Sequence, residues 1–187
     1  MNLLVTGFGA FPGVSRNPSG EVARAVDGAD LDGVRVVGRV LDVSYARGPR
    51  EAIRVARSIG ATLVIGLGVA STRSAVDVER RAVRAAEGPA DVDGRTRSGL
   101  RGPPIVEATI DVVRLAAALG ANLSDDAGRY VCNAWLYRVA RGCAAPVGFV
   151  HVPPAGLDPA VLFAGLRALL AQPPATAASS ALSSSPR

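Results

Sequence analysis

The sequence predicts an α/β protein: a twisted, mostly parallel sheet with helices on both faces, in a single domain. Short, fully apolar runs such as Thr62–Leu67 and Val147–Val152 are typical of buried parallel strands. Segments with helical spacing of apolar residues lie between these runs, which is the alternation expected of βαβ units. Of the 187 residues, 49% are apolar and only 4% aromatic, so we expect an Ala/Val/Leu-packed α/β domain long enough for a sizeable buried core.

The first third of the chain begins with a strand. The run Asn2–Thr6 is apolar and stops at Gly7, and the Gly-rich stretch 7–20 that follows reads as a long loop. Pro18 and Ser19 then open a helix that reaches about Val26. A second strand is predicted over Val34–Leu41.

The middle of the chain has a helix, a strand and a less regular region. A helix is predicted to begin near Pro49, and the strand Thr62–Leu67 is expected to end at Gly66 and Gly68. The stretch 74–84 fits a two-residue period only in part and is interpreted as strand-like. Residues 87–104 are rich in Gly, Pro, Asp and Arg, so they predict a long lid or binding loop.

The last third alternates helix and strand before the composition changes. Helices are predicted over Asp111–Leu119 and from about Val131 to Arg141, and the strand Val147–Val152 follows. Asp158 as N-cap and Pro159 at the first helical position start a final amphipathic helix. From residue 172 the chain is almost only Pro, Ala and Ser, so we expect a domain over 1–171 and a disordered tail over 172–187.

The net charge of +5 comes from arginine alone, because the chain has no lysine. A basic surface could bind nucleic acid or another polyanion. Alternatively, the arginines are scattered solvated residues. Their tightest cluster, Arg80, Arg81 and Arg84, alternates with apolar residues and forms no block with aromatics, which favours the second interpretation and no nucleic-acid partner.

The two cysteines, Cys132 and Cys143, show no spacing that is typical of zinc ligands. On one helix they would lie about 16 Å apart, too far for a disulfide. We predict a cytoplasmic protein, because the thiols are expected to be reduced and the sequence shows no signal-peptide pattern. We predict no membrane partner, because no apolar run is long enough to cross a bilayer.

Cys132 is the most reactive group that the sequence offers. Ser124, Asp125 and Asp126 are helix-starting residues, so Cys132 is expected in or near the first turn of a helix, where the helix dipole stabilises a thiolate. The only histidine, His151, lies near the carboxyl end of a predicted strand, the edge at which α/β sheets place their sites. This joint placement predicts a cysteine nucleophile with a histidine base.

Each of these residues also has a structural interpretation. A lone cysteine in a helix can be a small buried hydrophobe, and a lone histidine beside a strand can be structural. Cys143 is interpreted as structural. Glu79 is the best candidate for the carboxylate that orients the histidine, and the alternative is an exposed acid paired with Arg80 or Arg81.

The glycines at 7, 9 and 13 raise a dinucleotide-binding alternative, because they follow a strand and precede a helix. The fingerprint requires glycine at position 12, which is Pro12, and no acid follows the second strand convincingly. The signal for a dinucleotide is therefore weak.

Four motifs occur in the order VTGFGAFPG…NPS, VDVERRAV, YVCNAWLY and GFVHVP. Together they resemble pyroglutamyl peptidase I (pyrrolidone-carboxylate peptidase), over residues 3 to about 170. The resemblance implies a single three-layer α/β/α domain and a cytosolic cysteine peptidase that removes N-terminal pyroglutamate from peptides without metal or cofactor. Related proteins are often oligomers, so a homo-oligomer is possible.

Residue roles follow from the resemblance motif by motif. Cys132 corresponds to the nucleophile, His151 to the general base and acid, and Glu79 to the orienting carboxylate. Phe8 and Phe11 match two aromatics that line the site of the pyrrolidone ring. Asn17 matches the asparagine of the NPS turn, and its expected role is structural hydrogen bonding.

This chain departs from the family pattern where the substrate is recognised. The segment GVASTR stands where the family has GQAGGR, so Val69 replaces a glutamine that can hydrogen-bond the lactam. Losing that contact would cost about 1–3 kcal/mol. Pro89 lies near an expected arginine. The alternative is therefore a family member with altered or lost specificity that acts as a binding protein.

Overall fold

The computed structural model describes residues 1–85 and 87–171, so the predicted tail over 172–187 lies outside the described residues. The helices and strands are, in chain order, β1 (Asn2–Phe8), α1 (Pro18–Ala25), β2 (Asp30–Leu31), β3 (Val34–Leu41), α2 (Arg47–Ser58), β4 (Ala61–Val69), β5 (Asp77–Glu79), β6 (Arg81–Val83), β7 (Ile105–Glu107), α3 (Val112–Leu119), β8 (Asn122–Ser124), α4 (Val131–Gly142), β9 (Val147–Val152) and α5 (Pro159–Leu170).

The main sheet has the strand order β2-β3-β1-β4-β9-β5-β8. Its central strands β3, β1, β4 and β9 run parallel, whereas β2 pairs antiparallel with β3, and β5 pairs antiparallel with β9. Strands β6 and β7 form a separate two-stranded sheet. The mostly parallel α/β sheet predicted from the apolar runs is confirmed, because those runs supply its buried centre.

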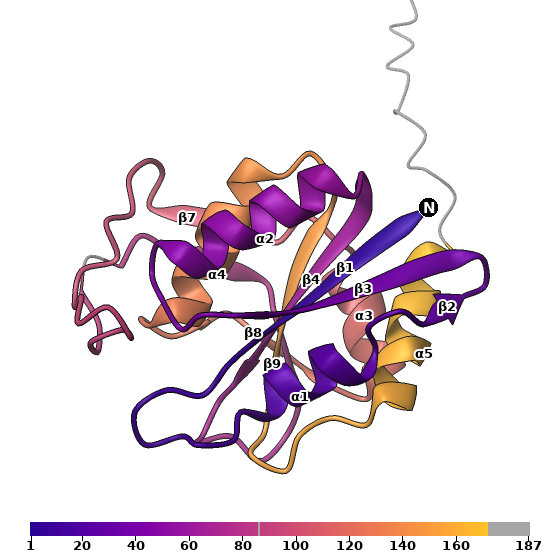
Figure 1. The fold of residues 1–187 in the computed structure, drawn as a ribbon, viewed down its shortest axis with the longest axis horizontal. Helices are drawn as coiled ribbons and strands as arrows, with labels where there is room; N and C mark the ends of the chain where they lie inside the picture. The colour runs from indigo at the N-terminus through magenta and orange to yellow at the C-terminus, as the bar shows by residue number, and fades with distance from the viewer. Residues whose placement is uncertain (86, 172–187) are drawn as a thin grey trace, which may run out of the picture.

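Helices cover both faces of the sheet and complete three layers (Figure 1). On one face, α1, α3 and α5 pack through buried residues such as Val22, Leu115 and Leu162. On the other face, α2 and α4 pack through residues such as Ala52 and Trp135. Each face therefore has its own apolar core, and α4, which carries Cys132, lies on the second.

Two glycines on β4 allow α4 to lie close to the sheet. A Cβ atom added at Gly66 would lie 2.6 Å from the Trp135 ring, and one added at Gly68 would lie 2.6 Å from Sγ of Cys132. Alternate residues of a strand point to the same face, so both glycines open the face that α4 covers. The prediction that these glycines end the strand was wrong, since β4 continues to Val69.

Other differences lie in short or irregular segments. The strand-like stretch 74–84 contains two strands in different sheets, β5 and β6, with Arg80 between them. Helix α2 begins at Arg47, two residues before Pro49. Strands β2, β7 and β8 have two or three residues each, too few to show a periodic pattern.

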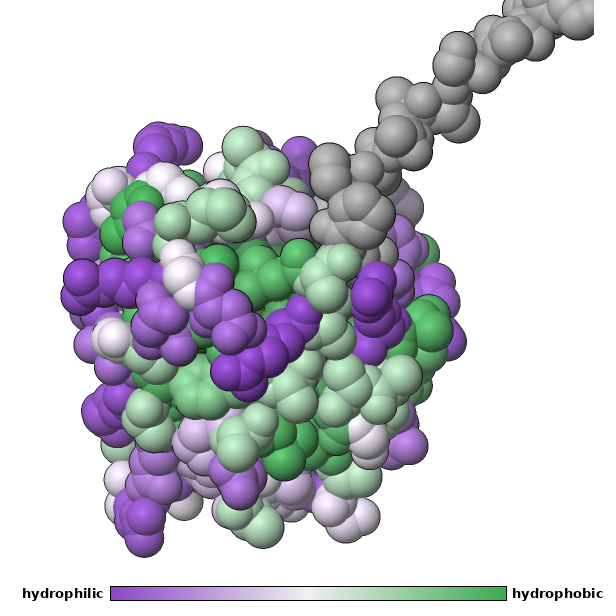
Figure 2. Space-filling model, turned by 90° about the vertical axis from the view of Figure 1, so that its right-hand side faces the viewer, coloured by the Kyte–Doolittle hydropathy of each residue, from purple (hydrophilic) through white to green (hydrophobic). Residues whose placement is uncertain are grey.

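The side of the molecule on which β2 and α5 lie carries apolar surface interrupted by hydrophilic side chains (Figure 2). Exposed apolar residues of α3 and α5 include Val113 and Val161. The homo-oligomer stays a prediction. Within the described ranges, no helix combines the length and the apolar character needed to cross a membrane.

Candidate active site

Cys132 is the second residue of α4. The N-cap, Tyr130, has an extended backbone and makes no side-chain cap hydrogen bond. The first-turn N–H groups of a helix have no partner within the helix, and they carry the positive end of its dipole. Cys132 therefore lies in the helix turn that carries these donors, as expected for its place at a helix start.

Ser124, Asp125 and Asp126 do not start this helix, so that part of the prediction was wrong. Ser124 ends β8, and its hydroxyl accepts a hydrogen bond from the Asp126 N–H at 3.1 Å. The Asp126 carboxylate accepts from the Gly128 N–H at 2.9 Å. These side chains stabilise the turn before α4 because such residues also bond their own backbone two positions on.

His151 and Glu79 are joined across two neighbouring antiparallel strands. In the register of β5 and β9, His151 lies opposite Asp77, and Glu79 lies opposite Phe149, so all four side chains are on one face. Nδ1 of His151 lies 2.7 Å from Oε1 of Glu79. Glu79 is fully buried and His151 is 5% exposed. With Nδ1 as the donor to the carboxylate, Nε2 is the ring nitrogen left for another partner.

The sulfur of Cys132 lies on the same face of the sheet as His151. Gly68 pairs with His151 in the register of β4 and β9, and the Cα of Gly68 faces Sγ of Cys132. Phe149 packs edge-on against the His151 ring, with 5.1 Å between the ring centroids. The structure therefore brings the three predicted residues, Cys132, His151 and Glu79, together at one edge of the sheet.

The charges around His151 favour the imidazolium. Burial alone would lower the pKa of His151. The charge of a Cys132 thiolate and its hydrogen bond to the ring have the opposite effect, and so do the hydrogen bond and charge of Glu79. Together they outweigh burial and raise the pKa of His151 to about 9. The imidazole of His151 is thus a base strong enough to accept the thiol proton of Cys132, and it stays protonated while the thiolate is beside it.

Arg73 completes the cluster, and the sequence reasoning missed it. Its Nη1 donates to Oε1 of Glu79 at 2.7 Å and to Oδ2 of Asp77 at 3.1 Å, while its Nη2 donates to the Asp126 carbonyl at 2.6 Å. The alternative of an exposed Glu79 paired with Arg80 or Arg81 is contradicted, since both of those arginines pair with Asp125.

The ionisation of Glu79 depends on these neighbours. Burial alone would raise the pKa of Glu79, but hydrogen bonding and charge from His151, together with Ser124 and Arg73, hold the pKa below its ordinary value. Oε1 accepts from both Arg73 and His151, whereas the buried Oε2 has no hydrogen-bond partner among the described residues. Glu79 is therefore held as a carboxylate with one oxygen directed at the imidazole.

A narrow cavity of about 30 Å³ reaches the sulfur, and we call it the inner pocket. Its lining residues are Phe8, Phe11, Asn17, Val43, Val69, Tyr130, Val131 and Cys132. All three residues predicted to bind substrate, Phe8, Phe11 and Val69, thus lie beside the predicted nucleophile. Phe8 comes from the end of β1, Val69 from the end of β4, and Phe11 from the loop after β1.

The polar side chains of the inner pocket are already engaged. The Asn17 amide donates to the Gly9 carbonyl at 3.0 Å and accepts from the Ser19 N–H at 3.2 Å, which makes Asn17 the N-cap of α1. The Tyr130 hydroxyl donates to the Ala90 carbonyl at 2.9 Å. The structural role expected of Asn17 is confirmed, and the walls of the pocket are mainly apolar.

The inner pocket opens into a larger cavity of about 440 Å³, which we call the middle groove. The two share Phe11, Val69 and Tyr130 as lining residues. Pro89 and Ala90, from the long loop predicted over 87–104, also line the middle groove. The buried Asp91 holds this part of the loop, since its carboxylate accepts from the Tyr45 N–H at 2.9 Å.

Other reactive groups lie elsewhere or are too few to form a site. Cys143 follows the end of α4, and burial raises the pKa of its thiol. In the part of the chain that the structure describes, no group of three or more His, Cys, Asp or Glu side chains could hold a metal ion.

Comparison with known proteins gives one consistent result. The profile of the pyroglutamyl peptidase family matches residues 1–158. The pyrrolidone-carboxylate peptidase of Pyrococcus furiosus is 30% identical over 170 residues, which are 82% of this chain and 81% of that protein. The corresponding protein of Thermococcus litoralis is 33% identical over 172 residues, which cover 81% of this chain and 76% of that protein.

The solved structure of pyrrolidone carboxyl peptidase from Thermococcus litoralis superposes with a TM-score of 0.81 at 28% identity, covering 90% of this chain and 93% of that one. The structure of the enzyme from Pyrococcus furiosus and its Cys-free mutant gives a TM-score of 0.80 at 25% identity, covering 91% and 96%. The similarity in sequence and the similarity in fold both extend over most of this chain and of its relatives. The chain therefore belongs to the pyroglutamyl peptidase family.

Proposed function

We propose that this chain is a cysteine exopeptidase that hydrolyses the amide bond after an N-terminal pyroglutamyl residue through a thioester intermediate. The observation that carries the proposal is the cluster in which Glu79 holds the imidazole of His151 beside Cys132. A nucleophile, a base and an acceptor that fixes the tautomer of the base are the parts that such catalysis requires. Family membership supports the peptidase activity itself.

In the first half of the reaction, Nε2 of His151 accepts the thiol proton of Cys132, and the thiolate attacks the pyroglutamyl carbonyl carbon. The oxyanion that forms is stabilised by backbone N–H groups in the first turn of α4. When the intermediate collapses, the C–N bond breaks and the imidazolium of His151 donates its proton to the departing amine.

In the second half, water attacks the thioester and His151 accepts a proton from it. The C–S bond breaks, free pyroglutamate leaves and the thiol of Cys132 is restored. Glu79 accepts a hydrogen bond from Nδ1–H of His151 in both halves of the reaction, which fixes the tautomer of the ring. The negative charge of Glu79 also stabilises the imidazolium. Arg73 acts as a positioning residue, because it touches Glu79 and not the reacting atoms.

We place the pyrrolidone ring where the inner pocket meets the middle groove, beside Phe11, Val69 and Tyr130, because the 30 Å³ of the inner pocket is only about the volume of one water molecule. Apolar and aromatic walls fit the ring methylenes, and the lining that the two cavities share joins the pocket at Cys132 to the middle groove.

The proposal is tested by incubating the protein with a pyroglutamyl amide reporter beside a prolyl amide reporter, which lacks the lactam carbonyl. We expect release from the first only. Cys132→Ala should abolish release with an unchanged unfolding midpoint, and the matched control Cys143→Ala should keep it. Release that survives Cys132→Ala would mean that the nucleophile is another residue.

A second candidate function is a family member with altered or lost specificity that binds ligands without turnover. The observation that favours it is the apolar inner pocket, where Val69 offers no hydrogen bond and the Asn17 amide is engaged in the loop. Alkylation separates the two functions: an activated Cys132 should react with iodoacetamide well below about pH 8, whereas an inert thiol should not.

Both cysteines are free in the structure, and the cytoplasmic location stays a prediction.

A further inference from the structure

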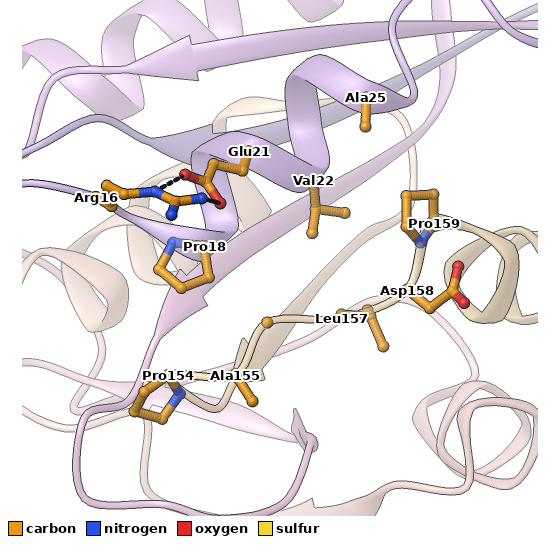
Figure 3. A pocket seen from close by; sticks show the side chains of 11 residues that line it. Arg16, Pro18, Glu21, Val22, Ala25, Pro154, Ala155, Leu157, Asp158 and Pro159 are labelled. Carbon is orange, nitrogen blue, oxygen red and sulfur yellow. Dashed lines mark hydrogen bonds and ion pairs between the residues drawn. The ribbon is translucent and has the colours of Figure 1, made fainter.

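A third cavity of about 570 Å³ continues from the middle groove, and we call it the outer groove. The two cavities share Arg16, Pro18 and Pro154 as lining residues. Figure 3 shows α1 on one side of the outer groove and the segment after β9 on the other. The three cavities therefore form a continuous path that starts at Cys132 and runs along α1.

From this continuity we infer that the outer groove binds the leaving part of the substrate, several residues beyond the scissile bond, and that the preferred substrates are peptides rather than short pyroglutamyl amides. The inference rests on the proposed function. Because nothing precedes the pyroglutamyl residue, the substrate chain continues only on the leaving side. The path that leads out of the inner pocket is then the path of the leaving peptide.

The length of the outer groove sets the length of the peptide. It follows α1 from Pro18 to Ala25, a distance of about 10 Å at a rise of 1.5 Å per helical residue. An extended peptide advances about 3.3–3.6 Å per residue, so about three residues span this distance. With one or two residues in the middle groove, the path accommodates about four or five residues after pyroglutamate.

The lining of the outer groove indicates the chemistry of those residues. Val22, which is 6% exposed, and Leu157 give it an apolar floor between α1 and the segment after β9. Arg16 and Glu21 form an ion pair at the end nearest the middle groove, with Nε of Arg16 2.8 Å from Oε1 of Glu21, and Asp158 lies at the far end. An apolar side chain on the leaving peptide therefore fits the centre of the outer groove.

The test measures kcat/KM for a series of amidated peptides with one to six residues after pyroglutamate, with leucine at the fourth position and alanine elsewhere. We expect kcat/KM to rise about tenfold between two and five residues, the effect of burying one small apolar side chain. Hydrolysis of the shortest member tests the proposed function, and the increase with length tests the outer groove.

Ala155→Trp fills the outer groove from one wall, and Ala25→Trp fills it from the other, so one variant remains if the other does not fold. In either variant the ratio of kcat/KM for the long and short peptides should fall to about one, since the buried side chain is excluded. Ala144→Trp is the matched control, because Ala144 lines a separate cavity beside Cys143. A flat length profile in the wild type, or an unchanged ratio in both groove variants, would overturn the inference.

Discussion

The Cα of Gly68 faces the sulfur of Cys132 so closely that an added Cβ atom would lie 2.6 Å from Sγ. The same atom would lie 2.8 Å from the Phe149 ring. Gly68 also pairs with His151 across β4 and β9, so this one backbone position contacts the nucleophile and adjoins the base. The absence of a side chain at Gly68 therefore helps to set where the sulfur lies relative to the imidazole.

Gly68→Ala should displace the sulfur of Cys132. We expect kcat to fall about 100-fold, because a displacement of about 1 Å in a catalytic geometry costs that much. Crowding against Phe149 should lower the free energy of unfolding by about 1–3 kcal/mol. The matched control is Gly9→Ala, where an added Cβ would meet its nearest neighbours at 3.6 Å. Steady-state kinetics and urea unfolding measure both effects, and near-normal kcat in Gly68→Ala would refute the argument.

A substitution at Arg73 tests whether its hydrogen bond and ion pair with Glu79 position the catalytic cluster. Arg73→Met leaves the fully buried carboxylate of Glu79 with one cationic neighbour instead of two. We expect kcat/KM to fall about 10- to 100-fold through misplacement of His151, and the unfolding free energy to fall by up to about 3 kcal/mol.

Arg73→Lys should recover part of the activity of Arg73→Met, since an ammonium group can still bond Oε1 of Glu79. Arg80→Met is the control, because Arg80 neighbours Glu79 in sequence but pairs with Asp125 through an exposed ion pair. Equal kinetic losses in Arg73→Met and Arg80→Met would show that Arg73 has no specific effect on the site.

The case of Arg73 shows which part of the site could be predicted from the sequence. Cys132, His151 and Glu79 were found because each belongs to a motif in a strand or a helix start. Local sequence places only Arg80 and Arg81 beside Glu79. Arg80 points to the opposite side of the extended chain, and Arg81 begins β6 in the separate two-stranded sheet. Arg73 reaches Glu79 only because the chain turns between β4 and β5, and no periodic pattern signals that turn.

The fold also has parts that the sequence predicts and parts that it does not. Strands β4 and β9 were predicted because burial on both faces makes them almost wholly apolar. The start of α4 near Val131 was predicted, but Ser124, Asp125 and Asp126 do not start it. Ser124 and Asp126 stabilise their own turn instead, and Asp125 pairs with Arg80 and Arg81. Side chains that favour caps also favour turns, so local sequence does not separate the two uses.

The single histidine makes the protonation of His151 directly measurable. In an NMR titration its ring should titrate with a pKa of about 9, because the charges of Cys132 and Glu79 outweigh burial. Glu79→Gln and Cys132→Ser each remove one of those charges, so the pKa should fall in both variants. Titration of the wild type near the ordinary value of 6.5 would contradict the proposed cluster.

The same proton links stability to pH. The pKa of His151 is about 9 in the folded chain and ordinarily 6.5, so the folded state binds the proton more tightly than the unfolded state. The stability from this proton is complete below about pH 6.5 and is lost as the pH rises through about 9. Urea unfolding at about pH 6 and about pH 9.5 should show this loss in the wild type, and it should be smaller in His151→Gln.

Val69→Gln tests whether the apolar inner pocket limits the recognition of pyroglutamate. Val69 lines both the inner pocket and the middle groove. The resemblance to the family implies a glutamine at this position. A hydrogen bond from a glutamine amide to the lactam is worth about 1–3 kcal/mol, or roughly 5- to 150-fold in kcat/KM. We therefore expect Val69→Gln to raise kcat/KM for a pyroglutamyl reporter and to leave a prolyl reporter unaffected.

The control for this substitution is Val69→Leu, which changes the size of the side chain without adding a hydrogen-bonding group. A gain in Val69→Gln that Val69→Leu does not share assigns the effect to the hydrogen bond. Two other outcomes argue against this interpretation. Equal activity in wild type and Val69→Gln means that backbone groups already satisfy the lactam, and loss of activity in both variants means that the pocket admits no larger side chain at position 69.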